Sequence, residues 1–307
     1  MLNSIKMDKF EAPPFFLVGC DRSGTTLLAA MLDRHSRIAV PPETHFFRST
    51  CTGDKEPSPP LSHGQLLTQF ASNHRAADMG LDARALAARF ETLDPTYRNL
   101  FLSAVGLYAQ ARNKCRVGEK TPGHLARIPR ILHFLPEAKV ICVVRDGRDV
   151  ARSLVRVAWS HRDQRRHCLR WNRASRHVLR YGRTFSNNVR MVLFEDLLRD
   201  PQSQLSDLCE FLGECYEPQQ LDASVPTGVV PQQEKRWKQK AAEPLDPSRA
   251  HAWRQDTSEH DKHLMNAAMG HYLRAFGYPD TTLAGCPIQK RAGLWVANQW
   301  CRLWYRK

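Results

Sequence analysis

The sequence predicts an α/β fold in which a parallel β-sheet is flanked by helices on both faces. Three segments lead to this prediction, because in each an apolar strand is followed by a turn and then by helical periodicity. The strands are residues 15–19, 139–144 and 189–194, and the helices after them are residues 26–34, a stretch from residue 149, and residues 201–212. Fully apolar strands that alternate with helices are typical of a parallel sheet covered on both sides.

Helical segments are also expected between the first two of these units, so the sheet carries a helical insertion after its first strand–helix unit. One helix is expected to begin at Asp94-Pro95, because aspartate caps helices and proline fits the first helical position. Residues 219–247 are rich in Gln, Lys and Pro and indicate an extended surface loop. Residues 258–276 are expected to form the final helix, ended by Gly277.

The predicted organisation is a single domain, because no linker separates two hydrophobic cores. The domain covers residues 13–280, with a mainly helical insertion at residues 51–115, and residues 281–307 form a basic, aromatic tail. The tail resembles an interfacial segment that makes a peripheral contact with an anionic membrane. Packing against the domain, or a contact between subunits, explains its composition equally well.

Composition excludes several classes of protein. The chain has 307 residues, of which 42% are hydrophobic, so it can bury a core and is not disordered throughout. No apolar run approaches the roughly 18 residues of a membrane span. Nine cysteines without Cys-x-x-Cys spacing indicate neither a disulfide framework nor a zinc site. The first residues do not resemble a secretory signal, so a cytoplasmic location is expected.

Positive charge is concentrated in the middle of the chain. Lys and Arg outnumber Asp and Glu by 45 to 31, a formal net charge of +14. Between Arg112 and Arg190 there are 20 basic residues and five acidic ones, so this segment accounts for the whole excess. Such a field suits a polyanionic ligand: a nucleotide, a nucleic acid or an acidic lipid surface.

A glycine-containing turn joins the first predicted strand to its helix. The spacing Gly19-x4-Gly24 resembles a P-loop, in which backbone N–H groups and a helix N-terminus hold a phosphate. The lysine that follows the second glycine in nucleoside-triphosphatases is replaced by Thr25, and the cation lies earlier, at Arg22. The loop is therefore expected to bind one phosphate, with Arg22 directed at a neighbouring anionic group. A plain helix N-cap is the alternative.

A second anion site is expected at the end of the next predicted strand. Arg145 ends this strand, and Ser153 follows eight residues later. Ligands of open parallel sheets bind at this edge, and a phosphate monoester suits an arginine combined with a hydroxyl donor. Two anion sites on neighbouring strand ends indicate a nucleotide that is phosphorylated at two separate positions.

These two motifs resemble the 5′-phosphosulfate loop and the 3′-phosphate site of sulfotransferases that use 3′-phosphoadenosine 5′-phosphosulfate (PAPS). The resemblance runs from about residue 15 to residue 279 and includes Gly-Glu-Lys-Thr-Pro at 118–122 and Phe-Glu-Asp-Leu-Leu-Arg-Asp-Pro at 194–201. Arg22 in place of the commoner lysine resembles the tyrosylprotein sulfotransferases and their bacterial relatives. One departure is Phe194, which stands where tyrosylprotein enzymes have a tyrosine.

The resemblance implies in-line transfer of a sulfuryl group from PAPS to an acceptor hydroxyl, or less readily to an amine. Arg22 and Lys120 are expected to stabilise the departing phosphate and the sulfuryl oxygens. No metal is expected, because fixed cations take the place of the metal that phosphoryl transfer uses. The 5′-phosphate is expected to be held by four loop residues, Ser23, Gly24, Thr25 and Thr26.

Glu43 is the expected general base, because residues 43–47, Glu-Thr-His-Phe-Phe, resemble the segment that carries the catalytic glutamate in heparan-type sulfotransferases. Burial is expected to raise the pKa of this carboxyl towards neutrality. Two alternatives stay open: Glu43 merely pairs with an arginine, or His45 is the base. In an extended segment, the side chain of His45 would point to the opposite face from Glu43.

Further groups are candidates for binding the nucleotide or the acceptor. Arg236 and Lys238 are expected to close over the 3′-phosphate, as basic C-terminal loops do in members of the family that the chain resembles. Trp237 or Trp253 is a candidate for an aromatic wall against adenine. The insertion at residues 51–115 is expected to shape the acceptor side of the site. The Arg162–Arg183 stripe lies on one helix face and suits an anionic acceptor, although an ordinary exposed face would look the same. Its members are Arg162, Arg166, Arg170, Arg173, Arg176, Arg180 and Arg183.

Two other functions stay open at this stage. A kinase-like P-loop transferase is disfavoured by the missing loop lysine. A non-enzymatic nucleic-acid binder would use the basic segment, but it would leave Glu43 and the paired phosphate motifs unexplained. No nucleic-acid partner is therefore expected.

Overall fold

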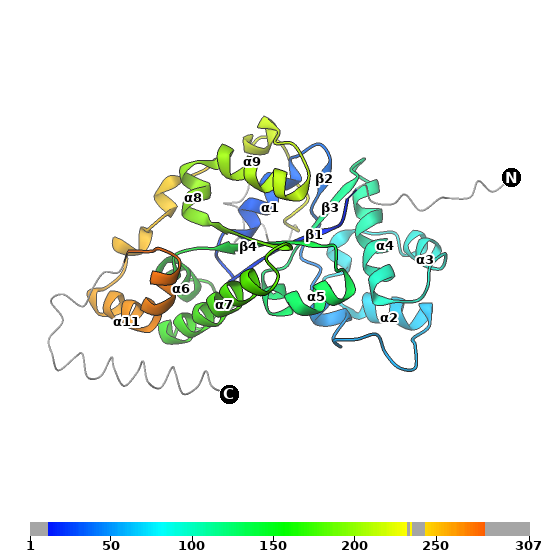
Figure 1. The fold of residues 1–307 in the computed structure, drawn as a ribbon, viewed down its shortest axis with the longest axis horizontal. Helices are drawn as coiled ribbons and strands as arrows, with labels where there is room; N and C mark the ends of the chain where they lie inside the picture. The colour runs from blue at the N-terminus through cyan, green and yellow to red at the C-terminus, as the bar shows by residue number, and fades with distance from the viewer. Residues whose placement is uncertain (1–11, 232–233, 235–242, 280–307) are drawn as a thin grey trace.

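The computed structural model describes residues 12–231, 234 and 243–279, and its centre is a five-stranded parallel sheet (Figure 1). The strands lie in the order β2-β3-β1-β4-β5, and every neighbouring pair is parallel. Their bounds are β1 Phe15–Gly19, β2 Ile38–Ala39, β3 Arg116–Lys120, β4 Lys139–Val144 and β5 Val189–Leu193. The predicted parallel sheet is therefore confirmed.

Helices cover both faces of this sheet, because apolar side chains of its strands point alternately to one face and to the other. On β1, Phe15 and Leu17 belong to one core cluster, whereas Phe16 and Val18 belong to the other. The first face is covered by α1 (Thr25–Asp33), α8 (Phe194–Arg199) and α9 (Pro201–Leu212). The second is covered by α4 (Tyr97–Gln110), α5 (Ile128–Phe134), α6 (Gly147–Val155), α7 (Gln164–Thr184) and α11 (Glu259–Ala275).

Two strands, β2 and β3, are not among those that the sequence predicts. β2 has only two residues, and β3 reads Arg-Val-Gly-Glu-Lys, which contains no apolar run. All five residues of β3 are nevertheless buried, because this strand lies between β2 and β1. β3 ends at Lys120, so it brings the Gly-Glu-Lys-Thr-Pro motif to the edge where β1 also ends.

The helical insertion lies between β2 and β3 and contains α2 (His63–Ser72), α3 (Ala83–Phe90) and α4. The predicted helix start at Asp94-Pro95 is wrong, because α4 begins at Tyr97. Thr96 is the N-cap: its backbone is extended, and its hydroxyl accepts a hydrogen bond from the backbone N–H of Asn99 at 3.1 Å.

The other expected helices lie within two residues of their predicted bounds. α6 begins at Gly147 rather than at Asp149, because the side chain of Asp146 accepts from the backbone N–H of Arg148 and caps the helix. α9 spans the expected residues. α11 follows the N-cap Ser258 and ends before Gly277, whose φ is 78°.

The C-terminal part of the chain is described only in part. The expected loop at 219–247 begins with a short 3-10 helix, Pro218–Leu221, and the tail at 281–307 lies outside the described residues. The membrane contact of that tail and the cytoplasmic location stay predictions. Within the described ranges, no helix combines the length and the apolar character that crossing a membrane requires.

Candidate functional site

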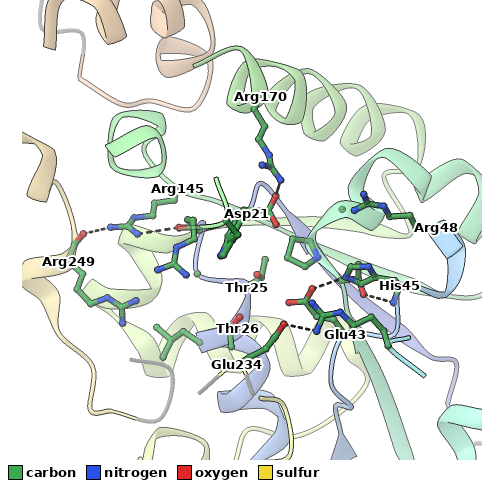
Figure 2. Close-up of a pocket in the computed structure, with 18 residues that line it drawn as sticks. Asp21, Thr25, Thr26, Glu43, His45, Arg48, Arg145, Arg170, Glu234 and Arg249 are labelled. Atoms are coloured by element: carbon green, nitrogen blue, oxygen red, sulfur yellow. Dashed lines mark hydrogen bonds and ion pairs between the residues drawn. The ribbon is translucent and has the colours of Figure 1, made fainter. Parts of the chain in front are cut away.

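A cavity of about 470 Å³ opens at the carboxyl ends of β1, β3 and β4 (Figure 2). Because these strands are parallel neighbours, the segments that follow them meet at one edge of the sheet. Arg22 lies in the loop after β1, Thr121 directly follows β3, and Arg145 directly follows β4; all three line the cavity. The cavity therefore lies where the sequence places both anion motifs.

The loop between β1 and α1 presents the N-terminus of the helix to this cavity. Arg22 and Gly24 have positive φ values of 70° and 96°, so the chain turns tightly. No side chain caps α1, and Thr25 and Thr26 line the cavity. The Oγ of Ser23 is buried and has no hydrogen-bond partner within the described part of the chain. An uncapped helix N-terminus beside an unsatisfied hydroxyl is an arrangement that a bound anion completes.

Three arginines from distant parts of the chain converge beside this loop. Arg145 donates through Nη1 to the carbonyl of Arg22 at 3.2 Å and through Nη2 to the carbonyl of Arg249 at 2.7 Å. Arg22 Nε donates to Ser153 Oγ at 3.1 Å, so the serine expected near Arg145 joins the same group. Burial, and then the nearby Arg145, lower the pKa of both Arg22 and Arg249. Mutual repulsion between these like charges favours an anion at this point.

The fully buried ring of Phe194 packs against this group. The guanidinium carbons of Arg145 and Arg249 lie 4.7 Å and 5.6 Å from the ring centroid, which is within cation–π range. The ring also approaches Gly24 so closely that a Cβ there would lie 2.2 Å from Cδ2 of Phe194. Phe194 thus supports both anion motifs by packing, where a tyrosine would add a hydroxyl.

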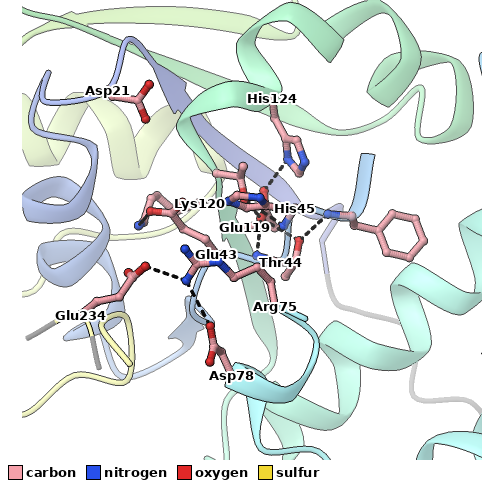
Figure 3. A network of polar contacts seen from close by, with 12 residues as sticks. Asp21, Glu43, Thr44, His45, Arg75, Asp78, Glu119, Lys120, His124 and Glu234 are labelled. Atoms are coloured by element: carbon pink, nitrogen blue, oxygen red, sulfur yellow. Dashed lines mark hydrogen bonds and ion pairs between the residues drawn. The ribbon is translucent and has the colours of Figure 1, made fainter. Parts of the chain in front are cut away.

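Glu43, His45 and Lys120 meet in another part of the cavity (Figures 2 and 3). Lys120 Nζ lies 2.6 Å from Glu43 Oε1, and His45 Nε2 lies 3.1 Å from Glu43 Oε2. Glu43 and His45 line the cavity, whereas the side chain of Lys120 is fully buried behind them. The carboxylate is thus held by a lysine and a histidine, and it also interacts electrostatically with Arg75.

The expectation that His45 points away from Glu43 is wrong. It assumed an extended backbone, but His45 has a φ of 50° and precedes a short π-helix, Phe46–Thr50. This turn brings the imidazole back to the carboxylate. A left-handed residue other than glycine is uncommon and leaves no trace in the hydrophobic pattern, so the contact could not be found from the sequence.

The buried carboxylate of Glu119 holds the segment that carries Glu43 in place (Figure 3). Its Oε1 accepts from the hydroxyl of Thr44 at 2.8 Å, and its Oε2 pairs with His124 Nδ1 at 2.9 Å. Burial acts to raise the pKa of Glu119, but His124 and the hydrogen bonds outweigh it, so the pKa is lowered. Lys120, the next residue of β3, leaves the strand on the opposite face and contacts Glu43. Two consecutive residues of β3 therefore contact the segment that carries Glu43 from opposite faces of the strand.

Three described residues that were predicted to bind the nucleotide do not line the cavity: Ser23 and Ser153, which adjoin its lining residue Arg22, and Trp253. Trp253 is only 2% exposed, its indole N–H donates to Asp146 Oδ2 at 3.1 Å, and Arg148 lies 4.1 Å over its ring. The predicted contact of Trp253 with adenine is therefore wrong, because the protein itself occupies both the edge and the face of the indole. Arg236, Trp237 and Lys238 lie outside the described residues. Among the residues that are described, no group of three or more His, Cys, Asp or Glu could hold a metal ion.

Several cavity residues were not predicted to lie at the site. Trp159 is 52% exposed and lines the cavity. Arg75, from the insertion, donates to Glu234 Oε1 at 2.6 Å (Figure 3). Arg170 of α7 pairs with Asp21 in the phosphate loop (Figure 2). Spacing along the sequence indicated a basic helix face, but only the packing of α7 shows which of its arginines reaches the cavity.

Comparison with known families identifies the chain. A family model described as "Sulfotransferase family" matches residues 13–218, which is more than half of the sequence. The chain therefore belongs to the sulfotransferase family, a family of enzymes, and the resemblance drawn from its motifs is confirmed.

Its similar proteins include two named relatives from vertebrates. The chain is 27% identical over 208 residues to protein-tyrosine sulfotransferase 1 of Danio rerio, covering 66% of this chain and 54% of that protein. It is 27% identical over 213 residues to protein-tyrosine sulfotransferase 2 of Gallus gallus, covering 66% of this chain and 52% of that protein. The chain thus spans about half the length of these curated relatives.

Two solved structures share the fold. The sulfotransferase domain from the Synechococcus PCC 7002 olefin synthase superimposes with a TM-score of 0.64 at 22% identity, covering 89% of this chain and 97% of that one. The sulfotransferase domain from the curacin biosynthetic pathway gives a TM-score of 0.61 at 20% identity, covering 87% and 98%. These similarities agree with the parallel sheet and its flanking helices.

Proposed function

We propose that this chain transfers a sulfuryl group from PAPS to an acceptor hydroxyl, with Glu43 as the general base. The observation that carries the proposal is the convergence of Arg22, Arg145 and Arg249 beside the uncapped N-terminus of α1. A nucleotide with phosphates at two positions can meet both of these anion-binding elements at once. Glu43 lines the same cavity, where it can take a proton from an acceptor.

The residues around the cavity fit the two phosphates of such a nucleotide. Ser23, Thr25 and Thr26 combine hydroxyls with the N-terminus of α1 and are assigned to the 5′-phosphate. Arg145 is assigned to the 3′-phosphate. Its Nε is buried and makes no hydrogen bond to any described residue, so a donor is left for a ligand. The hydroxyl of Ser153 accepts from Arg22 and keeps its own proton to donate.

The proposed reaction is an in-line displacement at sulfur. The acceptor oxygen forms a bond to sulfur as the bond between sulfur and the 5′-phosphate oxygen breaks, and that oxygen keeps the electron pair. Glu43 takes the proton of the acceptor hydroxyl. Arg22 stabilises the charge on the departing phosphate, because a fixed cation in a water-poor site interacts strongly with developing charge. Lys120, which the sequence assigned to the sulfuryl oxygens, lies behind Glu43 and orients its carboxylate instead.

The two partners of Glu43 suggest how an acceptor reaches it. His45 lines the cavity and contacts Oε2, whereas the buried Lys120 contacts Oε1 from behind. We infer that an acceptor hydroxyl replaces His45 at Oε2, while Lys120 keeps the carboxylate oriented. An approach through Lys120 would require the most deeply buried of the three side chains to move.

Arg145→Gln is expected to weaken binding of 3′-phosphoadenosine 5′-phosphate about 10- to 100-fold, because charge-assisted hydrogen bonds to the 3′-phosphate are lost. Affinity for adenosine 5′-phosphate, which lacks that phosphate, should change little. Isothermal titration calorimetry on the full chain measures both. Arg190→Gln, which alters an exposed arginine of β5, is the control and should bind both nucleotides like the wild type. Equal wild-type affinity for the two nucleotides, or tighter binding of ATP, contradicts the proposed donor.

We further propose that the acceptor is anionic. α7 carries all but the first arginine of the stripe, since Arg162 precedes the helix, and every member is exposed. Arg170 lines the cavity, so this basic face leads to the site. The acceptor side also includes Arg75, which the insertion contributes to the cavity lining. An acidic peptide or a sulfated glycan matches this charge.

A triple substitution, Arg173→Gln, Arg176→Gln and Arg180→Gln, tests the anionic acceptor. It is expected to raise the KM for a tyrosine peptide flanked by glutamates about 3- to 100-fold, since each exposed ion pair contributes about 0.2–1 kcal/mol. The salt dependence of KM should flatten as well. Steady-state kinetics between about 50 and 500 mM salt, over which the Debye length shortens about threefold, measure both quantities. An unchanged KM and salt dependence for this peptide and for heparan sulfate would remove the substrate role of the stripe.

A further inference from the structure

We propose that Arg170 of α7 belongs to the donor site and acts through Asp21, by neutralising a carboxylate that the phosphate loop itself carries. This inference rests on the proposed function, because it concerns the same nucleotide. Asp21 directly precedes Arg22 and lines the cavity together with the residues assigned to the donor. Without a partner, its negative charge would oppose the binding of a phosphate in this loop.

The contact between the two side chains is direct. The guanidinium of Arg170 reaches down from α7 to the carboxylate of Asp21 at the rim of the cavity (Figure 2). The side chains are 46% and 29% exposed, so the pair lies at the surface of the site but not in bulk solvent. Within the described ranges, Arg170 is the only member of the arginine stripe that lines the cavity.

The size of the effect follows from the charges involved. Two unit charges about 4 Å apart interact weakly in water and about fourfold more strongly at the dielectric constant of a protein surface. A phosphate bound by the loop would be repelled by the negative charge of Asp21 at a similar separation. The positive charge of Arg170 offsets that repulsion. The buried thiol of Cys20, next to Asp21, is subject to both charges. Its pKa is raised to about 12, chiefly by burial and then by the charge of Asp21, whereas the charge of Arg170 acts to lower it.

The pair also links two elements that are far apart in the sequence. Arg22 follows Asp21 in a left-handed conformation, which residues other than glycine seldom adopt. A tether from α7 to Asp21 fixes the loop just before the residue that is assigned to the departing phosphate. Arg170 is therefore a positioning residue for the donor and not primarily an acceptor contact.

Single and double variants of the full chain test this inference. Arg170→Gln is expected to weaken binding of 3′-phosphoadenosine 5′-phosphate about tenfold at low salt, by the interaction just described. Asp21→Asn should bind it at least as tightly as the wild type. The double variant should return to within about threefold of the wild type, because the charge that Arg170 offsets is gone. Arg165→Gln, another exposed arginine of α7 outside the stripe, is the matched control and should bind normally.

Calorimetry measures the affinities, and thermal unfolding of each variant shows that the fold is kept. The inference is overturned if Arg170→Gln binds the nucleotide like the wild type, or if the double variant is as weak as Arg170→Gln. It is equally overturned if Arg170→Gln changes only the KM of the glutamate-flanked peptide. A wild-type chain that does not bind the nucleotide at all would instead contradict the proposed function, so the two failures are distinct.

Discussion

Glu43→Gln is expected to lower kcat about 10²- to 10⁴-fold while leaving the affinity for 3′-phosphoadenosine 5′-phosphate nearly unchanged. Glutamine keeps the shape of the side chain, and its oxygen can still accept from Lys120, but it cannot take a proton from the acceptor. Transfer of labelled sulfate from PAPS to the glutamate-flanked tyrosine peptide measures kcat. Calorimetry with the product nucleotide measures whether the donor site is intact.

His45→Gln provides the comparison, because His45 contacts the other oxygen of the same carboxylate. If Glu43 is the base, this variant should lose less activity than Glu43→Gln. Near-normal turnover by Glu43→Gln, together with a large loss in His45→Gln, would transfer the role of base to His45. The direct contact between the two residues makes this comparison necessary.

Gly24→Ala is expected to weaken nucleotide binding by about 100-fold or more. Gly24 has a φ of 96°, and a Cβ at this position would lie 2.2 Å from the ring of Phe194. The strained backbone costs about 1–3 kcal/mol and the overpacking a similar amount, so the loop should leave the conformation that holds the phosphate. Calorimetry with 3′-phosphoadenosine 5′-phosphate measures the loss of affinity. Thermal unfolding measures how much the substitution destabilises the whole domain.

Gly182→Ala is the matched control for this substitution. Gly182 lies in α7, and a Cβ there would meet no atom within 4 Å. Alanine should leave nucleotide affinity unchanged and stabilise the helix by about 0.5–1 kcal/mol. If Gly24→Ala bound the nucleotide as tightly as Gly182→Ala, the loop would not be the phosphate site.

The parts of the molecule that could be predicted are those with local signals. The first strand, its glycine turn and its helix follow one another within 20 residues, and their apolar patterns give their position almost to the residue. α9 was predictable because Pro201 and Gly213 mark its two ends. The family could be predicted for the same reason, since its motifs are short and lie at strand ends.

The parts that could not be predicted depend on packing between distant segments. β3 has polar residues in its interior, and only its place between two other strands makes it a buried strand. The side chain of Arg145 donates to the carbonyl of Arg249 across 104 residues of sequence, just beyond the segment whose composition indicated a loop. The error for Trp253 has a similar cause, because Asp146 and Arg148 cover an indole that the sequence alone could assign to a ligand as easily as to the core.

Every described carboxylate at the cavity is balanced by a cation from another element. These pairs are Asp21 with Arg170, Glu43 with Lys120, and Glu234 with Arg75. The cavity thus neutralises its own carboxylates before any ligand enters, and these three pairs leave the +14 net charge unchanged because that figure is already the excess of bases over acids. An arbitrary polyanion drawn to the basic surface would find only part of the cavity open to it. Discrimination between negatively charged molecules is therefore set by where the protein leaves its charge uncompensated, rather than by how much charge it carries.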